Sequence, residues 1–162
     1  MKVEILKVGY LKENCYIVTK NDKSIIIDPG DEADRIINHC KGKKIVGVLI
    51  THNHFDHVGA LKEIENHFKI KENNNIIGLD FEIIDTPGHT SDSKTFYFKD
   101  DKVMFTGDFL FKGTIGRMDL PTGSVEDMKK SLEKIKDYPD DIIVYPGHGE
   151  STILGREKYY LI

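Results

Sequence analysis

Four side chains of types that bind metal ions stand within seven consecutive residues that follow an apolar run. The run is Ile45–Ile50, and the residues after it are Thr51-His52-Asn53-His54-Phe55-Asp56-His57. In an extended segment, side chains at positions i and i+2 lie on the same side of the backbone. His52 and His54 can therefore present their imidazoles to one cation while Asn53 faces away.

The chain must change direction just after these histidines. Apolar residues then recur at nearly helical spacing, at Val58, Leu61, Ile64 and Phe68. This spacing predicts a helix with Asp56 at or near its N-cap. Asp56 and His57 are redirected by the turn, so they can hold a second cation close to the first. Paired metal ions typically sit about 3.5–4 Å apart.

Three further motifs each place one titratable side chain just beyond a predicted strand. They are Thr86-Pro87-Gly88-His89-Thr90 after Phe81–Asp85, Gly107-Asp108 after Val103–Thr106, and Pro146-Gly147-His148-Gly149 after Ile142–Tyr145. A glycine in each motif lets the backbone turn tightly. Because strand ends at one edge of a sheet lie together in space, segments distant in sequence can converge on one pocket.

Each of these residues also has an ordinary structural interpretation, since strand-end Asp and His are common in turns and loop histidines can simply be solvated. Together, however, they supply the ligand positions that two metal ions need, namely His52, His54, Asp56, His57, His89, Asp108 and His148. Imidazole and carboxylate ligands suit Zn²⁺, Fe²⁺ and Mn²⁺. We therefore expect two divalent ions. The ligand types leave Zn²⁺, Fe²⁺ and Mn²⁺ open, and Zn²⁺ is our first choice. His39 and His67 lie on predicted helices and are interpreted as ordinary helix or surface residues.

Short apolar runs predict the strands that precede this loop. Three strands are expected in the first 28 residues, at Val3–Leu6, Cys15–Val18 and Ile25–Ile27. Asp28-Pro29-Gly30 stops the third strand, and a helix carrying Ile36, Ile37 and Cys40 follows. Gly42 suits the left-handed position after that helix.

The second half of the chain predicts more strands and one long helix. The strands are expected at Ile76–Ile77, Phe81–Ile84, Thr95–Phe98, Val103–Thr106 and Ile142–Tyr145, the third and fourth forming a hairpin. Ser124–Asp127 resembles a capping box. The helix after it ends before Pro139 and is apolar at three- and four-residue spacing through Val125, Met128, Leu132 and Ile135.

Length and composition indicate a single domain over residues 1–162, with 39% hydrophobic and 31% charged residues. No apolar stretch approaches the roughly 20 residues that span a bilayer, and the first residues are too charged for a signal peptide. We therefore expect a cytoplasmic protein in which Cys15 and Cys40 are reduced. The net charge of −4 and the scattered lysines exclude the basic stripe typical of nucleic-acid binding. The expected partner is a small molecule, without nucleic acid or membrane, and the oligomeric state stays open.

Several of these motifs, in this order, resemble those of the metallo-β-lactamase-fold hydrolases. They are His52-x-His54-x-Asp56-His57, Thr86-Pro87-Gly88-His89-Thr90, Thr106-Gly107-Asp108 and Pro146-Gly147-His148. Within this family the chain is similar to the short glyoxalase II-like branch, the hydroxyacylglutathione hydrolases. That likeness is carried by Gly107-Asp108-Phe109-Leu110-Phe111 and Gly116-Arg117-Met118-Asp119-Leu120-Pro121.

The resemblance implies an α/β fold, an αββα sandwich with two mixed β-sheets face to face and helices outside. It implies that His52, His54 and His89 hold the first metal, that Asp56, His57 and His148 hold the second, and that Asp108 bridges them. Asp56 and Asp108 would then also orient a hydroxide that bridges the metals. Arg117 stands where glyoxalase II carries a basic residue that contacts glutathione, so it is the candidate substrate-binding residue.

The implied activity is a dinuclear metal-dependent hydrolase that uses the bridging hydroxide to cleave an acyl thioester of the hydroxyacylglutathione type. The first alternative is a mononuclear iron persulfide dioxygenase of the same fold. A hydrolase of another small ester or lactone is the second, and a non-enzymatic metal-binding protein is the third. The last is disfavoured because structural metal sites are usually closed by four protein ligands.

Overall fold

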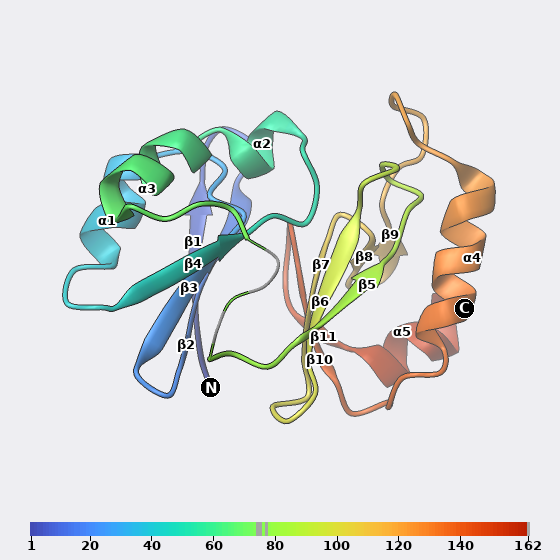
Figure 1. The fold of residues 1–162 in the computed structure, drawn as a ribbon. Coiled ribbons are helices and arrows are strands. Elements are labelled where there is room, and N and C mark those ends of the chain that lie inside the picture. The colour runs from blue at the N-terminus through green and yellow to red at the C-terminus, as the bar shows by residue number, and fades with distance from the viewer. Residues whose placement is uncertain (74–75, 77, 162) are drawn as a thin grey trace. The chain divides into compact units, whose positions relative to one another are not determined.

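The computed structural model describes residues 1–73, 76 and 78–161 of the chain. The described residues form two compact units, unit 1 over Met1–Asp80 and unit 2 over Phe81–Ile162. Each unit contains a mixed β-sheet and its own helices (Figure 1). The expectation of a single domain over residues 1–162 stays a prediction.

The sheet of unit 1 has the order β1-β2-β3-β4. Antiparallel pairing joins the first three strands, whereas β3 and β4 are parallel. The strands are β1 (Lys2–Val8), β2 (Glu13–Lys20), β3 (Lys23–Ile27) and β4 (Ile45–Leu49). The four predicted apolar runs thus form these strands, and the parallel step from β3 to β4 requires the crossover helix between them.

Two helices of unit 1 pack on its sheet through one apolar cluster. Ile36 of α1 (Ala33–His39) and Ile64 of α3 (Leu61–Phe68) are both fully buried in a cluster that contains Ile17 and Val48 of the sheet. Cys15 and Cys40 lie in the same cluster, and both are free thiols, as expected. Gly42 has a φ of 81°, which confirms the predicted left-handed turn after α1.

The helix predicted to run through Val58, Leu61, Ile64 and Phe68 is two helices, which corrects that prediction. The short α2 covers Phe55–Val58, and α3 begins at Leu61. Between them, the amide of Ala60 donates to the carbonyl of Pro29 at 3.0 Å. A Cβ on Gly59 would lie 2.3 Å from the carbonyl oxygen of Gly30, so only glycine permits this close approach.

The sheet of unit 2 has the order β11-β10-β7-β6-β5, in which β10 and β7 are parallel and the other pairs antiparallel. The strands are β5 (Glu82–Asp85), β6 (Lys94–Phe98), β7 (Val103–Gly107), β10 (Ile143–Pro146) and β11 (Thr152–Ile153). The predicted hairpin is β6–β7. The predicted strand at Ile76–Ile77 includes residue 77, which lies outside the described residues, and Ile76 belongs to no strand.

Helix α4 (Val125–Ile135) begins where the sequence predicts, because the Ser124 hydroxyl accepts from the Asp127 amide at 3.1 Å. Met128 and Ile135 of this helix pack with Met104 and Val144 of the sheet. The sequence did not predict the ribbon of β8 (Leu110–Phe111) and β9 (Thr114–Ile115), the strand β11, or helix α5 (Leu154–Leu161).

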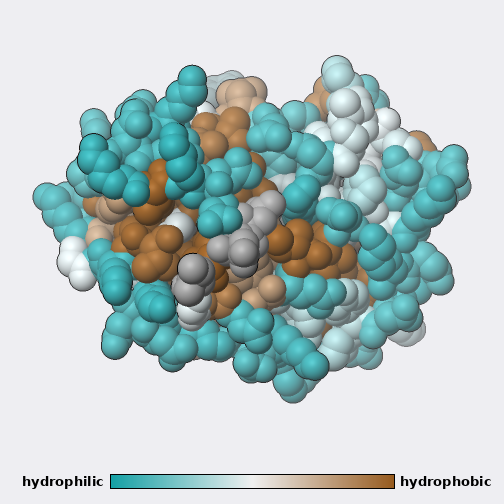
Figure 2. All heavy atoms as spheres, viewed as in Figure 1, coloured by the Kyte–Doolittle hydropathy of each residue, from teal (hydrophilic) through white to brown (hydrophobic). Residues whose placement is uncertain are grey.

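Polar side chains dominate the visible face of the molecule over both units, and apolar side chains form smaller patches among them (Figure 2). None of the helices within the described residues has the length and apolar composition needed to cross a bilayer.

Candidate metal centre

Unit 1 brings four predicted ligands together in the loop from the end of β4 into α2. The ring centroids of His52 and His54 lie 4.9 Å apart, and those of His52 and His57 lie 4.2 Å apart. The Nε2 atom of His57 is 3.5 Å from Oδ2 of Asp56. His52 is buried and His54 is partly buried, whereas Asn53 between them is exposed, so the alternation predicted for an extended segment holds here.

Asp28 organises this loop, although its place in the sequence predicts only the end of a strand. Its buried carboxylate accepts hydrogen bonds from the Thr51 amide at 2.7 Å and from the Thr51 hydroxyl at 2.6 Å. Nδ1 of His57 lies 2.8 Å from the same carboxylate. Asp28 stands just beyond a strand, with Gly30 nearby. The predicted ligands of unit 2 stand at the same kind of position, so this feature of the sequence could have pointed to Asp28.

Asp28 has a φ of 54°, a left-handed conformation that Asp tolerates better than most side chains. Gly30 lets the adjoining backbone approach the loop, because a Cβ at Gly30 would lie 1.7 Å from the carbonyl oxygen of Asp56. The segment 28–30 therefore fits against the loop by backbone contact as well as through the Asp28 carboxylate.

Glu13 of β2 is a second buried carboxylate beside His57, with 1% of its surface exposed. Its Oε1 atom lies 3.6 Å from Nδ1 of His57. Glu13, Asp28 and His57 each offer an atom within 4.8 Å of the others, which is close enough for a cation. Since Nδ1 of His57 already faces the Asp28 carboxylate as a hydrogen-bond donor, we interpret the two acids as groups that orient the imidazole.

Unit 2 brings together the other three predicted ligands around one carboxylate. Nε2 of His89 and Nε2 of His148 each lie 3.5 Å from Oδ2 of Asp108. The three residues follow β5, β7 and β10, as the strand-end argument predicts. His89 and Asp108 are buried, and His148 is partly exposed.

Two glycines permit the close packing around His89 and Asp108. Gly88 has a φ of 147°, and a Cβ there would lie 2.6 Å from the backbone of Met128 in α4. A Cβ at Gly116 would lie 1.7 Å from the carbonyl oxygen of Asp108 and 3.2 Å from Nδ1 of His89. The loops that carry the ligands thus rest directly on neighbouring backbone.

The hydrogen bonds of three histidines assign the ring nitrogen that carries the lone pair. The Thr51 hydroxyl donates to Asp28, so it accepts from Nδ1 of His52 at 3.0 Å. The Asp28 carboxylate accepts from Nδ1 of His57, and the carbonyl of Arg117 accepts from Nδ1 of His89 at 2.8 Å. Each ring therefore has its lone pair on Nε2, the state in which imidazole binds a metal.

The donor set of each unit therefore fits divalent metal ions. Unit 1 offers His52, His54, Asp56 and His57, and unit 2 offers His89, Asp108 and His148. Neutral imidazoles held through Nδ1 by an acceptor, together with carboxylates, are a combination that binds zinc and related ions. That these seven side chains hold metal stays a prediction.

The side chain of Arg117 forms an ion pair in unit 2. Its Nε and one terminal nitrogen donate to the two carboxylate oxygens of Asp119 at 2.7 and 2.8 Å. The hydrogen bond from Arg117 lowers the pKa of Asp119 to about 2. Both side chains are exposed. The guanidinium is therefore accessible for the predicted substrate contact, but any substrate carboxylate must compete with Asp119.

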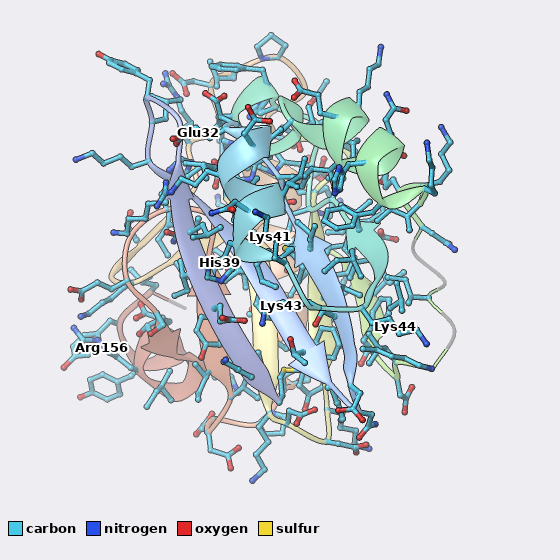
Figure 3. All side chains as sticks on the ribbon, turned by 90° about the vertical axis from the view of Figure 1, so that its left-hand side faces the viewer. Glu32, His39, Lys41, Lys43, Lys44 and Arg156 are labelled. Atoms are coloured by element: carbon cyan, nitrogen blue, oxygen red, sulfur yellow. The ribbon has the colours of Figure 1, made fainter. Side chains whose placement is uncertain are left out.

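His39 and His67, which the sequence predicts to be ordinary helix or surface residues, have structural partners. Nε2 of His39 lies 3.1 Å from Oε1 of Glu4, and the ammonium of Lys43 lies 2.9 Å from the other oxygen of Glu4. Hydrogen bonding to Lys43 is the main cause that lowers the pKa of Glu4. Figure 3 labels His39 and Lys43 on the same side of unit 1. His67 is exposed on α3 with its ring 4.7 Å from that of Phe68.

Comparison with known proteins identifies the family. The family model described as the Metallo-beta-lactamase superfamily matches residues 8–73 and 71–148. The chain is 33% identical to a Haemophilus influenzae protein named hydroxyacylglutathione hydrolase GloC, over 202 aligned positions that cover 98% of this chain and 95% of that protein. Because the alignment is longer than the 162 residues of this chain, the relative contains segments that this chain lacks.

Solved structures show the same fold. The structure titled BLEG-1 B3 metallo-beta-lactamase has a TM-score of 0.91 at 27% identity and covers 96% of both chains. The structure of TTHA1623 in a di-iron-bound form has a TM-score of 0.88 at 28% identity and covers 98% of both chains. The α/β architecture with two mixed sheets is thus the metallo-β-lactamase fold that the motifs imply. By sequence and by fold, the chain belongs to the metallo-beta-lactamase superfamily.

Proposed function

We propose that this protein is a metal-dependent hydrolase that cleaves acyl thioesters of the hydroxyacylglutathione type. The observation that carries the proposal is the set of imidazoles in both units whose Nδ1 atoms are held by acceptors, beside the carboxylates of Asp56 and Asp108. Support also comes from the H. influenzae relative named as a hydroxyacylglutathione hydrolase.

In this proposal, His52, His54 and His89 hold one metal ion, Asp56, His57 and His148 hold the other, and Asp108 serves both. Divalent ions in such sites lower the pKa of bound water towards about 7 and polarise a carbonyl oxygen. The chain needs no Ser-His-Asp triad for this chemistry.

The protein side chains contribute orientation and charge. An ionised carboxylate can accept hydrogen bonds, so those of Asp56 and Asp108 can orient an attacking water and take up its proton. Asp28 and the carbonyl of Arg117 fix the rings of His57 and His89. The guanidinium of Arg117 matches a carboxylate of the thiol part of the substrate.

The ligand types suit Zn²⁺, Fe²⁺ and Mn²⁺, and availability often decides between them. We propose two ions per chain with Zn²⁺ favoured. Because TTHA1623 is titled as a di-iron-bound form, iron is the main alternative. The cytoplasmic location also stays a proposal, and two buried thiols that form no disulfide are in keeping with it.

Two other activities follow from specific observations. Imidazole and carboxylate ligands also suit a single iron ion, which keeps the mononuclear iron persulfide dioxygenase as a second candidate. The high similarity to BLEG-1, titled as a metallo-beta-lactamase, makes β-lactam hydrolysis a third. Oxygen uptake that depends on a persulfide substrate would identify the dioxygenase, whereas the hydrolases consume no oxygen.

A substrate panel on the metal-loaded protein tests the proposal. The panel contains S-D-lactoylglutathione, other acyl thioesters, lactones and β-lactams, and each is measured by steady-state kinetics. We expect thioester hydrolysis that His89→Ala abolishes and that the matched control His67→Ala leaves unchanged. Efficient lactone or β-lactam cleavage beside inert thioesters would refute the thioesterase assignment.

A further inference from the structure

Three large apolar side chains of unit 1 are exposed around one hollow. Tyr10, Leu11 and Phe55 have exposed fractions of 96%, 49% and 75%. They line a cavity of about 300 Å³ whose wall also includes Asp31 and Asp56. Single exposed apolar residues are ordinary, but a group of them around a concave surface marks a binding site.

The hollow is held in shape by the turn between β1 and β2. The amide of Lys12 donates to the carbonyl of Gly9 at 3.2 Å, and Gly9 has a φ of 72°. The amide of Gly9 donates to the carboxylate of Glu32 at 2.9 Å, which ties this turn to the start of α1. Tyr10 and Leu11 therefore stand on a turn fixed at both ends.

The opposite wall comes from the loop of the candidate metal centre. Phe55 is the first residue of α2, and it lies between the predicted ligands His54 and Asp56. Gly30, which contacts the carbonyl region of Asp56 by close backbone approach, also lines the hollow. An apolar group in the hollow thus lies beside a predicted metal ligand.

The charge of the wall restricts what binds there. Among the described residues that line the hollow, the ionisable side chains with a formal charge at neutral pH are the acids Asp31 and Asp56. An anionic group would be repelled by them, whereas an uncharged aliphatic chain gains from burial against the aromatic rings. The glutathione carboxylates therefore do not fit this hollow.

We infer that the hollow binds the acyl chain of the substrate and that the preferred substrates carry an aliphatic acyl group longer than lactoyl. The preference among thioester substrates rests on the proposed thioesterase function. The binding of an aliphatic chain in the hollow does not depend on that function. Tyr10, Leu11 and Phe55 then determine acyl specificity. The thiol part lies on the other side of the scissile bond and is left to other residues.

The dependence of binding and of kcat/KM on the length of the acyl chain tests this inference directly. The dissociation constants of butanoate, hexanoate and octanoate for the metal-loaded protein are measured by calorimetry, and kcat/KM is measured for the matching S-acylglutathiones. Full burial makes binding about fourfold tighter for each added methylene. We expect this gain in the wild type and its loss in Tyr10→Ser and Phe55→Ser.

Tyr159→Ser is the matched control, because Tyr159 is 83% exposed on α5 and does not line the hollow. Metal content and melting temperature verify that each variant is folded. A chain-length gain that persists undiminished in Tyr10→Ser and Phe55→Ser would overturn the inference. So would a wild-type dimer that Tyr10→Ser dissociates in sedimentation, because a second copy would then cover the hollow. If carboxylates show the gain but thioesters are not hydrolysed, the acyl pocket stands and the proposed function fails.

Discussion

Asp28 shows how a residue outside the predicted ligand set can orient residues that belong to it. Its carboxylate holds Thr51 through two hydrogen bonds and His57 through a third contact. Such partners of metal-ligating histidines typically contribute 10–100-fold in metal affinity. The residue thus connects the end of β3 to the candidate metal loop.

We predict that Asp28→Asn weakens metal binding by about 10–100-fold while the protein stays folded. The amide keeps the shape of the side chain but loses the charge that orients His57. Competition with a chromophoric chelator measures the affinity. Asp22→Asn is the matched control, because Asp22 also has a positive φ, at 63°, and lies in an exposed turn. Equal affinities in the two variants would show that Asp28 does not support the site.

Arg117 gives a prediction about substrate binding. Arg117→Ala should raise KM for glutathione thioesters with kcat nearly unchanged, because the carbonyl that holds His89 remains. Asp119→Asn should lower KM, since it removes the competing carboxylate. Steady-state kinetics decide this, with Lys130→Ala as the exposed control on α4. An unchanged KM in both Arg117→Ala and Asp119→Asn would contradict the assignment of Arg117 as a substrate-binding residue.

The same ion pair has a defined pH range. The folded pKa of Asp119, about 2, lies below the ordinary value of 3.8. The pair is therefore fully formed above about pH 4 and is lost as the pH falls through about 2. Across neutral pH its state is constant, so the effect of Arg117→Ala on KM should not vary with pH there.

At the scale of elements, the C-terminal helix holds the β8–β9 ribbon through one buried acid. Glu157 of α5 accepts from the hydroxyl of Thr152 at 2.6 Å and from the amide of Gly113 at 3.0 Å. Gly113 lies in the turn of the ribbon, and the ribbon leads into Gly116 and Arg117. The helix thus fixes a segment that contacts His89.

Glu157→Ala should lower the free energy of unfolding by about 1–3 kcal/mol, because it leaves the buried Thr152 hydroxyl without its acceptor and removes the partly buried hydrogen bond from the Gly113 amide. Urea denaturation measures the loss. Glu133→Ala on the exposed face of α4 is the control and should change stability by less than about 0.5 kcal/mol. A loss no larger than that of the control would show that the ribbon does not depend on α5.

Local sequence pattern predicts some elements of this fold and misses others. Apolar runs and the Ser124 cap predicted the long strands and α4, because local pattern and packing agree there. The ribbon and β11 were missed because two-residue strands have no periodicity to detect. The break between α2 and α3 depends on a hydrogen bond from Ala60 to Pro29, which local sequence cannot reveal.

The candidate site was predictable to the extent that its residues are chemically distinctive. The seven predicted His and Asp ligands stand at strand ends or in the dense motif after β4, so their types and positions alone could single them out. That they hold metal stays a prediction. Asp28 and Glu13 were missed, because one looked like a turn former and the other like an ordinary strand residue. Burial beside His57 distinguishes them, and burial comes only with the fold.

At the scale of the whole molecule, the two cysteines report on the core of unit 1. Burial raises the pKa of Cys15 well above its ordinary range and that of Cys40 to about 11. Neither thiol should react with a disulfide reagent at pH 8 in the native protein, and both should react in denaturant. Rapid reaction of the native protein would contradict a closed core.

The same shift predicts a loss of stability in alkali. Unfolded thiols ionise near the ordinary pKa of 9.0, whereas Cys40 in the folded protein stays protonated up to about 11. The contribution of the Cys40 thiol to the free energy of unfolding is therefore fully present below about pH 9, and it falls as the pH rises towards 11. Urea denaturation between pH 8 and 11 measures this fall, and Cys40→Ala should reduce it.

The central claim is that the chain holds two metal ions through His52, His54, Asp56, His57, His89, Asp108 and His148. Elemental analysis of the metal-loaded and desalted protein tests it most directly. We predict about two divalent ions per chain in the wild type and fewer in Asp108→Ala. One tightly bound ion in the wild type, with no gain of activity when more metal is added, would contradict the dinuclear assignment.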